Sequence, residues 1–113
     1  MPAHYIPDRG DIAWMCFDPQ MGHEQAGRRP ALILSPLGYN RKVGLALLCP
    51  ITGRVKGYPF EVLLPKGIDV NGAVLSDQLK SMDWRLRRAE FIAKAPENIV
   101  LDVLGKAQSL LTV

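Results

Sequence analysis

The fold is decided between residues 45 and 75, which read LALLCPITGRVKGYPFEVLLPKGIDVNGAVL. Three short apolar runs in this stretch are separated by turn-forming residues: 45–49, 60–64 and 73–75. Proline follows each of the first two runs, and Asn71-Gly72, a strong hairpin signal, precedes the third. Many short strands with turn signals between them are typical of a small β-barrel or sandwich and not of a parallel sheet.

The flanking sequence extends this pattern toward both ends. Residues 11–17 are rich in aromatic and apolar side chains, and residues 31–35 form an apolar run that a proline closes, so both are predicted strands. Residues 84–88 and 91–93 supply one or two more. Residues 18–30 hold two prolines, two glycines and few apolar side chains, which predicts a long surface loop.

The end of the chain changes to a helical period. Between Pro96 and Leu111 the apolar positions recur at helical spacing: Ile99, Val100, Val103, Leu104, Ala107, Leu110 and Leu111. Pro96 is expected in the first turn, and Gly105, a weak helix former, indicates close packing against a neighbour. The sequence therefore predicts a mainly β domain of the α+β class, a small barrel capped by one C-terminal amphipathic helix.

Length and composition indicate that residues 1–113 form a single domain. The chain has 113 residues, of which 48% are apolar and 22% charged, enough for one core. No apolar stretch has the length of a membrane span and the first residues lack a secretion signal, so a cytoplasmic protein is expected. Cys16 and Cys49 lack the spacing of a metal or redox pair and are expected to be buried strand residues.

Positive charge is concentrated in the middle of the sequence. The whole chain carries +3, but residues 28–88 contain eleven Lys and Arg against four Asp and Glu, a net charge of +7. Aromatic residues lie among these cations: Tyr39, Tyr58, Phe60 and Trp84. This combination suits a polyanion with stackable bases, and an ordinary solvated surface is the alternative.

Metal and cofactor chemistry find no support in the sequence. His4 and His23 are far apart and the carboxylates are scattered, so no metal site is predicted. A glycine-rich phosphate loop and a nucleophilic serine motif are both lacking. Any catalysis is therefore predicted to need no metal and no cofactor.

The predicted loop contains one compact acid–base set, Gly22-His23-Glu24-Gln25-Ala26-Gly27-Arg28-Arg29-Pro30. On this interpretation Glu24 is the general base for an RNA 2′-hydroxyl, and Arg29 clamps the charge that builds on the phosphate oxygens. The alternative is a surface salt bridge that orders the loop. His23 is expected at the edge of the groove, although an imidazole is a common acid or base near neutral pH.

Four further residues have two interpretations each. Thr52, at a strand end, either donates its hydroxyl to a phosphate or bonds its own turn backbone. Tyr58 and Phe60 suit either core packing or base stacking. For Trp84 the core is the preferred place.

These residues belong to a series of motifs that resembles the MazF (PemK-like) family of toxins from type II toxin–antitoxin pairs. The series runs in order through residues 5–11, 17–19, 22–31, 34–36, 39–40, 56–62 and 77–81. A lone Gly-x-Arg-Pro would be weak. Together with Lys-Gly-Tyr-Pro-Phe-Glu-Val at 56–62 and Asp-Gln-x-Lys-Ser at 77–81 it is specific.

The resemblance implies a twisted, SH3-like barrel of the PemK and CcdB type that works as a homodimer. It implies a sequence-specific endoribonuclease that cuts single-stranded mRNA without a metal, leaves 2′,3′-cyclic phosphate and 5′-hydroxyl ends, and so inhibits translation and growth. The family's catalytic positions fall on Glu24, Arg29 and Thr52. Its RNA-groove positions fall on Phe17, Lys56, Tyr58 and Lys80.

Two departures from the family pattern border the expected groove. Arg28 is at a position where a histidine can occur in the family. Gly53-Arg54 follows Thr52, where the most similar family members have other polar residues. Both are assigned to RNA binding together with His23, and the family's cleavage motif is not transferred. An antitoxin with a flexible acidic tail is implied as the inhibitor.

Two functions of other classes compete with the nuclease. Gyrase-poisoning toxins share the implied fold, and the basic segment alone would suit a catalytically silent nucleic-acid-binding barrel. Glu24 favours the enzyme, because an acid inside a phosphate-binding loop weakens binding unless it takes part in the chemistry.

Overall fold

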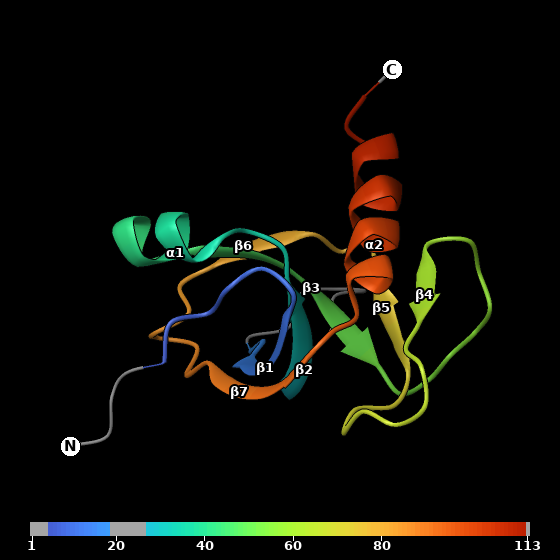
Figure 1. The fold of residues 1–113 in the computed structure, drawn as a ribbon, viewed down its shortest axis with the longest axis horizontal. Coiled ribbons are helices and arrows are strands. Elements are labelled where there is room, and N and C mark those ends of the chain that lie inside the picture. Colours follow the sequence, from blue (N-terminus) through green and yellow to red (C-terminus); the bar gives the residue numbers. More distant parts are fainter. Residues whose placement is uncertain (1–4, 19–26, 113) are drawn as a thin grey trace.

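The computed structural model describes residues 5–18 and 27–112, and within them the chain forms seven strands and two helices. The strands are β1 (Asp11–Cys16), β2 (Arg28–Ile33), β3 (Ala46–Thr52), β4 (Glu61–Leu63), β5 (Ala73–Leu75), β6 (Lys80–Met82) and β7 (Glu90–Lys94). The helices are α1 (Leu37–Val43) and α2 (Glu97–Ser109), and Figure 1 shows how they flank the strands. The mainly β class and the C-terminal helix are confirmed.

All strand pairs are antiparallel, in the order β4-β5-β3-β2-β1-β7, with β6 paired to β3 outside this path. β3 is central: one edge pairs with β2, while the other pairs first with β6 and then with β5. Over the described residues, the end strands β4 and β7 are not paired with each other. The sheet is therefore open, and the closed barrel of the sequence prediction is too strong a description; β4, β5 and β6 have only three residues each.

The sheet buries apolar side chains on both faces, because successive strand residues point to opposite sides. One core, which we call the α2 core, is packed under α2: Ile12, Leu32, Leu34, Cys49, Ile51, Val62, Val70, Val74, Ala95, Ile99, Val100 and Val103. The other, which we call the Trp84 core, lies on the opposite side of β1–β3: Met15, Phe17, Ala31, Ile33, Ala46, Leu48, Met82 and Trp84. The preference for Trp84 as a core residue is confirmed.

Two strands extend beyond their predicted ends. β2 begins at Arg28 because residues 28–30 pair with residues 14–16 of β1, so this part of the predicted 18–30 loop is strand. β3 continues through Pro50, which was expected to close it. Pro50 lies between the residues that pair with β6 and those that pair with β5, where its missing N–H interrupts neither ladder.

Two elements are not predicted by the sequence. α1 has no apolar stripe, since Asn40 is its only buried residue, and the amide of Asn40 donates to the carbonyls of Pro7 (2.8 Å) and Ser35 (2.9 Å). β6 is too short to show a period. Residues 84–88, predicted as strand, form a turn, whereas residues 91–93 do lie in β7.

α2 follows its predicted pattern in the body of the helix and departs from it at both ends and at Gly105. The helix ends at Ser109, so Leu110 and Leu111, which were predicted on its apolar positions, lie beyond it and are exposed. Ile99, Val100, Val103 and Ala107 are buried. Pro96 precedes the first turn as the N-cap and does not lie inside it. At Gly105 an added Cβ would meet nothing within 4 Å, so the predicted close packing is wrong within this chain.

Both cysteines are free thiols at strand positions. Cys49 is fully buried on β3, and burial, aided by the charge of Asp77, raises the pKa of its thiol to about 12. Cys16 ends β1 and is only partly buried. The prediction of a buried residue is thus confirmed for Cys49 and too strong for Cys16. Over the described residues, no helix is long and apolar enough to cross a membrane.

Candidate active site

Arg29 lies on β2, opposite Met15 of β1, and not in the loop where the sequence placed it. Residues two apart on a strand share a face, so Arg29 is on the face of Ala31 and Ile33, the face of the Trp84 core. Arg28 is directed to the other face. The strand, rather than a loop, therefore fixes the direction of the Arg29 side chain.

Thr52, the last residue of β3, is brought toward Arg29 by the strand register. Ala31 of β2 pairs with Pro50 of β3. The pairing of β2 with β3 ends there, but because side chains alternate along each strand, Thr52 lies on the same face of the sheet as Pro50, Ala31 and Arg29. The Thr52 hydroxyl is buried, and its oxygen accepts the backbone N–H of Arg54 at 3.1 Å, which is the turn role that the sequence left open. That bond uses the hydroxyl as an acceptor and does not consume its hydrogen.

The position of Thr52 depends on a close approach by Gly72. A Cβ at Gly72 would lie 2.0 Å from the carbonyl oxygen of Thr52, and Gly72 has a φ of +124°. We expect Gly72→Ala to lower the free energy of unfolding by about 3 kcal/mol, measured by urea denaturation. Gly53→Ala is the control, because a Cβ there meets nothing within 4 Å. Equal urea midpoints for the two variants would contradict the close approach.

Lys80 is a third predicted site residue on the same face. It begins β6 and pairs with Leu48 of β3, a member of the Trp84 core. Arg29, Thr52 and Lys80 thus come from three adjacent strands and share one face of the sheet. Phe17 is also on this side, but it is only 3% exposed and packed in the core, which favours a packing role over base stacking.

Three predicted RNA-binding residues lie in the segment between β3 and β4. Arg54, Lys56 and Tyr58 are exposed, Tyr58 by 40%. The carboxylate of Glu61 holds the segment by accepting the backbone N–H groups of Lys56 (3.1 Å) and Gly57 (2.7 Å). The sequence missed this role of Glu61, although its place in the 56–62 motif was a signal.

The ends of the segment between β1 and β2 are joined at their base. Phe17 donates its N–H to the carbonyl of Gly27 (2.8 Å), and Gly27 donates its own N–H to the carboxylate of Asp18 (2.9 Å). His23 and Glu24 fall in residues 19–26, outside the described residues. Their expected positions in the site stay predictions.

Arg28 lies on the opposite face of the sheet from Arg29 and contacts β7 and the turn before it. It donates to a carboxylate oxygen of Glu90 (3.0 Å) and to the carbonyl of Arg88 (2.9 Å). These residues and Ala89 line a surface pocket of about 440 Å³. With side chains 32% and 71% exposed, the Arg28–Glu90 ion pair contributes about 1 kcal/mol at most.

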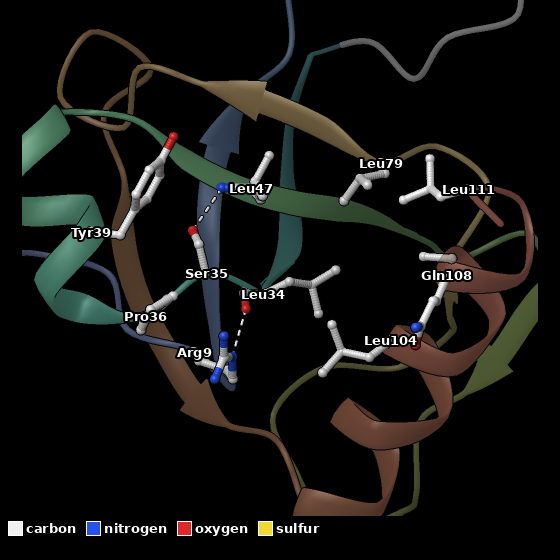
Figure 2. A pocket seen from close by; sticks show the side chains of 11 residues that line it. Arg9, Leu34, Ser35, Pro36, Tyr39, Leu47, Leu79, Leu104, Gln108 and Leu111 are labelled. Atoms are coloured by element: carbon white, nitrogen blue, oxygen red, sulfur yellow. Dashed lines mark hydrogen bonds between the residues drawn. The ribbon is translucent and has the colours of Figure 1, made fainter.

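A second pocket, of about 630 Å³, is apolar and lies between α1, β3 and α2 (Figure 2). Five of its eleven lining residues are leucines: Leu34, Leu47, Leu79, Leu104 and Leu111. Arg9 is at its edge with its Nε–H donated to the carbonyl of Leu34 at 2.7 Å. None of the predicted site residues within the described part of the chain lines this pocket, so we place the chemistry on the face that carries Arg29.

No cluster of His, Cys, Asp and Glu that could hold a metal ion occurs within residues 5–18 and 27–112. The candidate site of the described chain is therefore made of the cations Arg29 and Lys80 and the hydroxyl of Thr52, with Arg54, Lys56 and Tyr58 in the exposed segment that follows Thr52.

Comparison with known families identifies the chain. The model of the PemK-like, MazF-like toxins of type II toxin–antitoxin systems matches residues 8–111. The chain belongs to this family. Because the match covers nearly the whole sequence, the MazF-like resemblance that the motifs indicated is confirmed.

MazF-like relatives are found among well-characterised bacterial proteins. The chain is 53% identical to the endoribonuclease toxin MazF of Escherichia coli K12 over 89 residues, which is 79% of each chain. It is 36% identical to the Escherichia coli endoribonuclease PemK over 110 residues, 93% of this chain and 82% of PemK.

Solved MazF structures agree with the fold described above. Crystalline MazF from Deinococcus radiodurans has a TM-score of 0.93 and 56% identity, with 96% of this chain and 98% of that one covered. A MazE–MazF complex from the same organism has a TM-score of 0.86 and 49% identity, with 97% and 99% covered.

Proposed function

We propose that this MazF-like protein is a sequence-specific endoribonuclease that cuts single-stranded mRNA without a metal and thereby inhibits translation and growth. The observation that carries the proposal is the shared sheet face of Arg29, Thr52 and Lys80, at the base of the segment that contains Glu24. The endoribonuclease names of relatives 53% and 36% identical to the chain support the activity.

In the proposed reaction the RNA supplies its own nucleophile. Glu24 removes the proton of the 2′-hydroxyl, the 2′-oxygen bonds to phosphorus, and the bond from phosphorus to the 5′-oxygen breaks. Arg29 stabilises the negative charge on the nonbridging oxygens with fixed donors, and Thr52 donates its hydroxyl to the same phosphate. The products are a 2′,3′-cyclic phosphate and a 5′-hydroxyl, whose proton comes from water or from Arg29; the high pKa of a guanidinium favours water.

The residues around this centre are proposed to bind the RNA chain on either side. Lys80, Lys56 and Arg54 offer positive charge to phosphates, and the exposed ring of Tyr58 offers a stacking surface. Arg28, predicted to bind RNA as well, lies on the opposite face of the sheet and pairs with Glu90, so we do not place it in this groove. His23 is proposed at the groove edge. For Phe17 we propose a supporting role beneath the groove, because its ring is packed in the Trp84 core.

Partner proteins are proposed from charge and from the relatives. MazF of Deinococcus radiodurans has been crystallised with MazE. We propose that this chain is likewise bound by a cognate antitoxin, which neutralises it. We also propose that it acts in the cytoplasm as a homodimer. The net charge of +7 over residues 28–88 gives an acidic antitoxin tail an electrostatic reason to bind.

RNA cleavage in excess EDTA tests the proposal directly. Purified protein should cut a single-stranded RNA at the same rate with and without EDTA, because none of the proposed steps uses a metal ion. Mass spectrometry of the fragments should show 2′,3′-cyclic phosphate and 5′-hydroxyl ends. A chain with deoxyribose at the cleavage site is the control and should stay intact. Cleavage that stops on chelation, or 3′-hydroxyl ends, would overturn the mechanism.

A further inference from the structure

The turn after β6 places the side chain of Arg87 against the end of β1. The carboxylate of Asp83 accepts the backbone N–H groups of Arg85 (3.1 Å) and Leu86 (3.0 Å), and its carbonyl accepts the N–H of Arg87 (2.9 Å). The adjacent Trp84 is buried, and its Nε1–H donates to the carbonyl of Asn40 at 2.9 Å. Arg87 therefore projects from a well-anchored turn.

Arg87 contacts β1 at the point where the chain leaves the sheet. Its carbonyl accepts the N–H of Cys16 (2.9 Å). Its guanidinium returns to donate from Nη1 to the carbonyls of Cys16 (3.4 Å) and Asp18. The Asp18 carboxylate in turn accepts the N–H of Gly27. The Arg87 side chain thus holds the β1 end of the segment between β1 and β2, and Asp18 and Phe17 join that end to Gly27.

We propose that Arg87 is a positioning residue for the reaction proposed above, on which this inference rests. It holds Asp18, which in turn bonds Gly27, and the proposed role is that these fixed ends let Glu24 act together with Arg29. Arg87 is only partly exposed, and its guanidinium is directed at backbone carbonyls within the protein. The planar guanidinium of arginine has fixed donors that suit two neighbouring carbonyls, and the ammonium group of a lysine would suit them less well.

Steady-state kinetics of Arg87→Ala test this role against a matched control. We expect kcat to fall by about tenfold to a hundredfold, because small displacements of a reacting group are costly, while KM changes less than about twofold. Arg85→Ala removes the same charge from an exposed position of the same turn and should leave both constants unchanged. Arg87→Lys should recover part of kcat. A raised KM with normal kcat would instead identify a phosphate contact and overturn the proposal.

Combination with Glu24→Gln distinguishes positioning from loss of folding. If Arg87 acts through Glu24, then Arg87→Ala should reduce kcat little further in a Glu24→Gln protein. Multiplicative losses would overturn the proposal.

Amide hydrogen exchange supplies a readout that does not depend on activity. The N–H groups of Phe17 and Gly27 should exchange faster in Arg87→Ala than in Arg85→Ala. Unchanged exchange rates would refute the positioning role of Arg87 and leave the proposed function standing. A wild-type protein that cuts no RNA would refute the proposed function itself.

Discussion

Replacing Glu24 by glutamine is expected to lower the rate of RNA cleavage by about a hundredfold to ten-thousandfold, the usual contribution of a general base. Glutamine keeps the size of the side chain but cannot take the proton of the 2′-hydroxyl. RNA affinity should stay the same or improve slightly, because the substitution removes one negative charge near the phosphate. The single-turnover rate and the Kd for an RNA with deoxyribose at the cleavage site measure the two effects separately.

Glu97→Gln is the matched control for this experiment. Glu97 is exposed in the first turn of α2 and removal of its charge should leave cleavage unchanged. If Glu24→Gln weakened affinity as much as rate, the variant would have a folding defect or a binding role, and not the role of a base. A normal rate would remove Glu24 from the mechanism.

The sequence predicted those strands whose apolar content is visible locally. Residues 11–17 and 31–35 correspond to β1 and to the second half of β2, because buried strands need apolar side chains. α1 escaped prediction for the opposite reason. Its buried residue is Asn40, which is held by hydrogen bonds that no apolar period reveals.

The residue types of the candidate site could be predicted from the sequence, but the way the strands bring these residues together could not. Arg29 and Thr52 were chosen as residue types that bind phosphate, yet Arg29 was placed in a loop. Its strand position comes from pairing with Met15 in β1, and its approach to Thr52 comes from the pairing of Ala31 with Pro50. Such register links distant residues, so no local pattern encodes it.

Arg87 shows the same limit for a supporting residue. Nothing in the stretch Trp84-Arg85-Leu86-Arg87-Arg88 distinguishes the second of its arginines from the two others, and the stretch was predicted as strand. Its contacts arise because Asp83 folds the stretch into a turn. Contacts from a side chain to distant backbone carbonyls depend on this geometry and leave no sequence motif.

Replacing Arg29 by alanine should damage both rate and affinity, in contrast to the change at Glu24. The guanidinium binds the phosphate in the ground state and stabilises the added charge of the transition state. The cleavage rate should fall about a hundredfold or more. The slope of log Kd against log salt should become shallower by about 0.7, the value for one phosphate contact on a single strand. Arg41→Ala, an exposed cation on α1, is the matched control.

Arg29→Lys separates the two contributions of the guanidinium. Lysine keeps the charge but lacks the planar fork of donors, so affinity and salt slope should return toward the wild-type values while the cleavage rate stays low. Full recovery of the rate would show that charge alone suffices at this position. Unchanged RNA binding by Arg29→Ala would mean that the shared face of Arg29, Thr52 and Lys80 does not hold the phosphate, because the cation assigned to the phosphate would then contribute nothing.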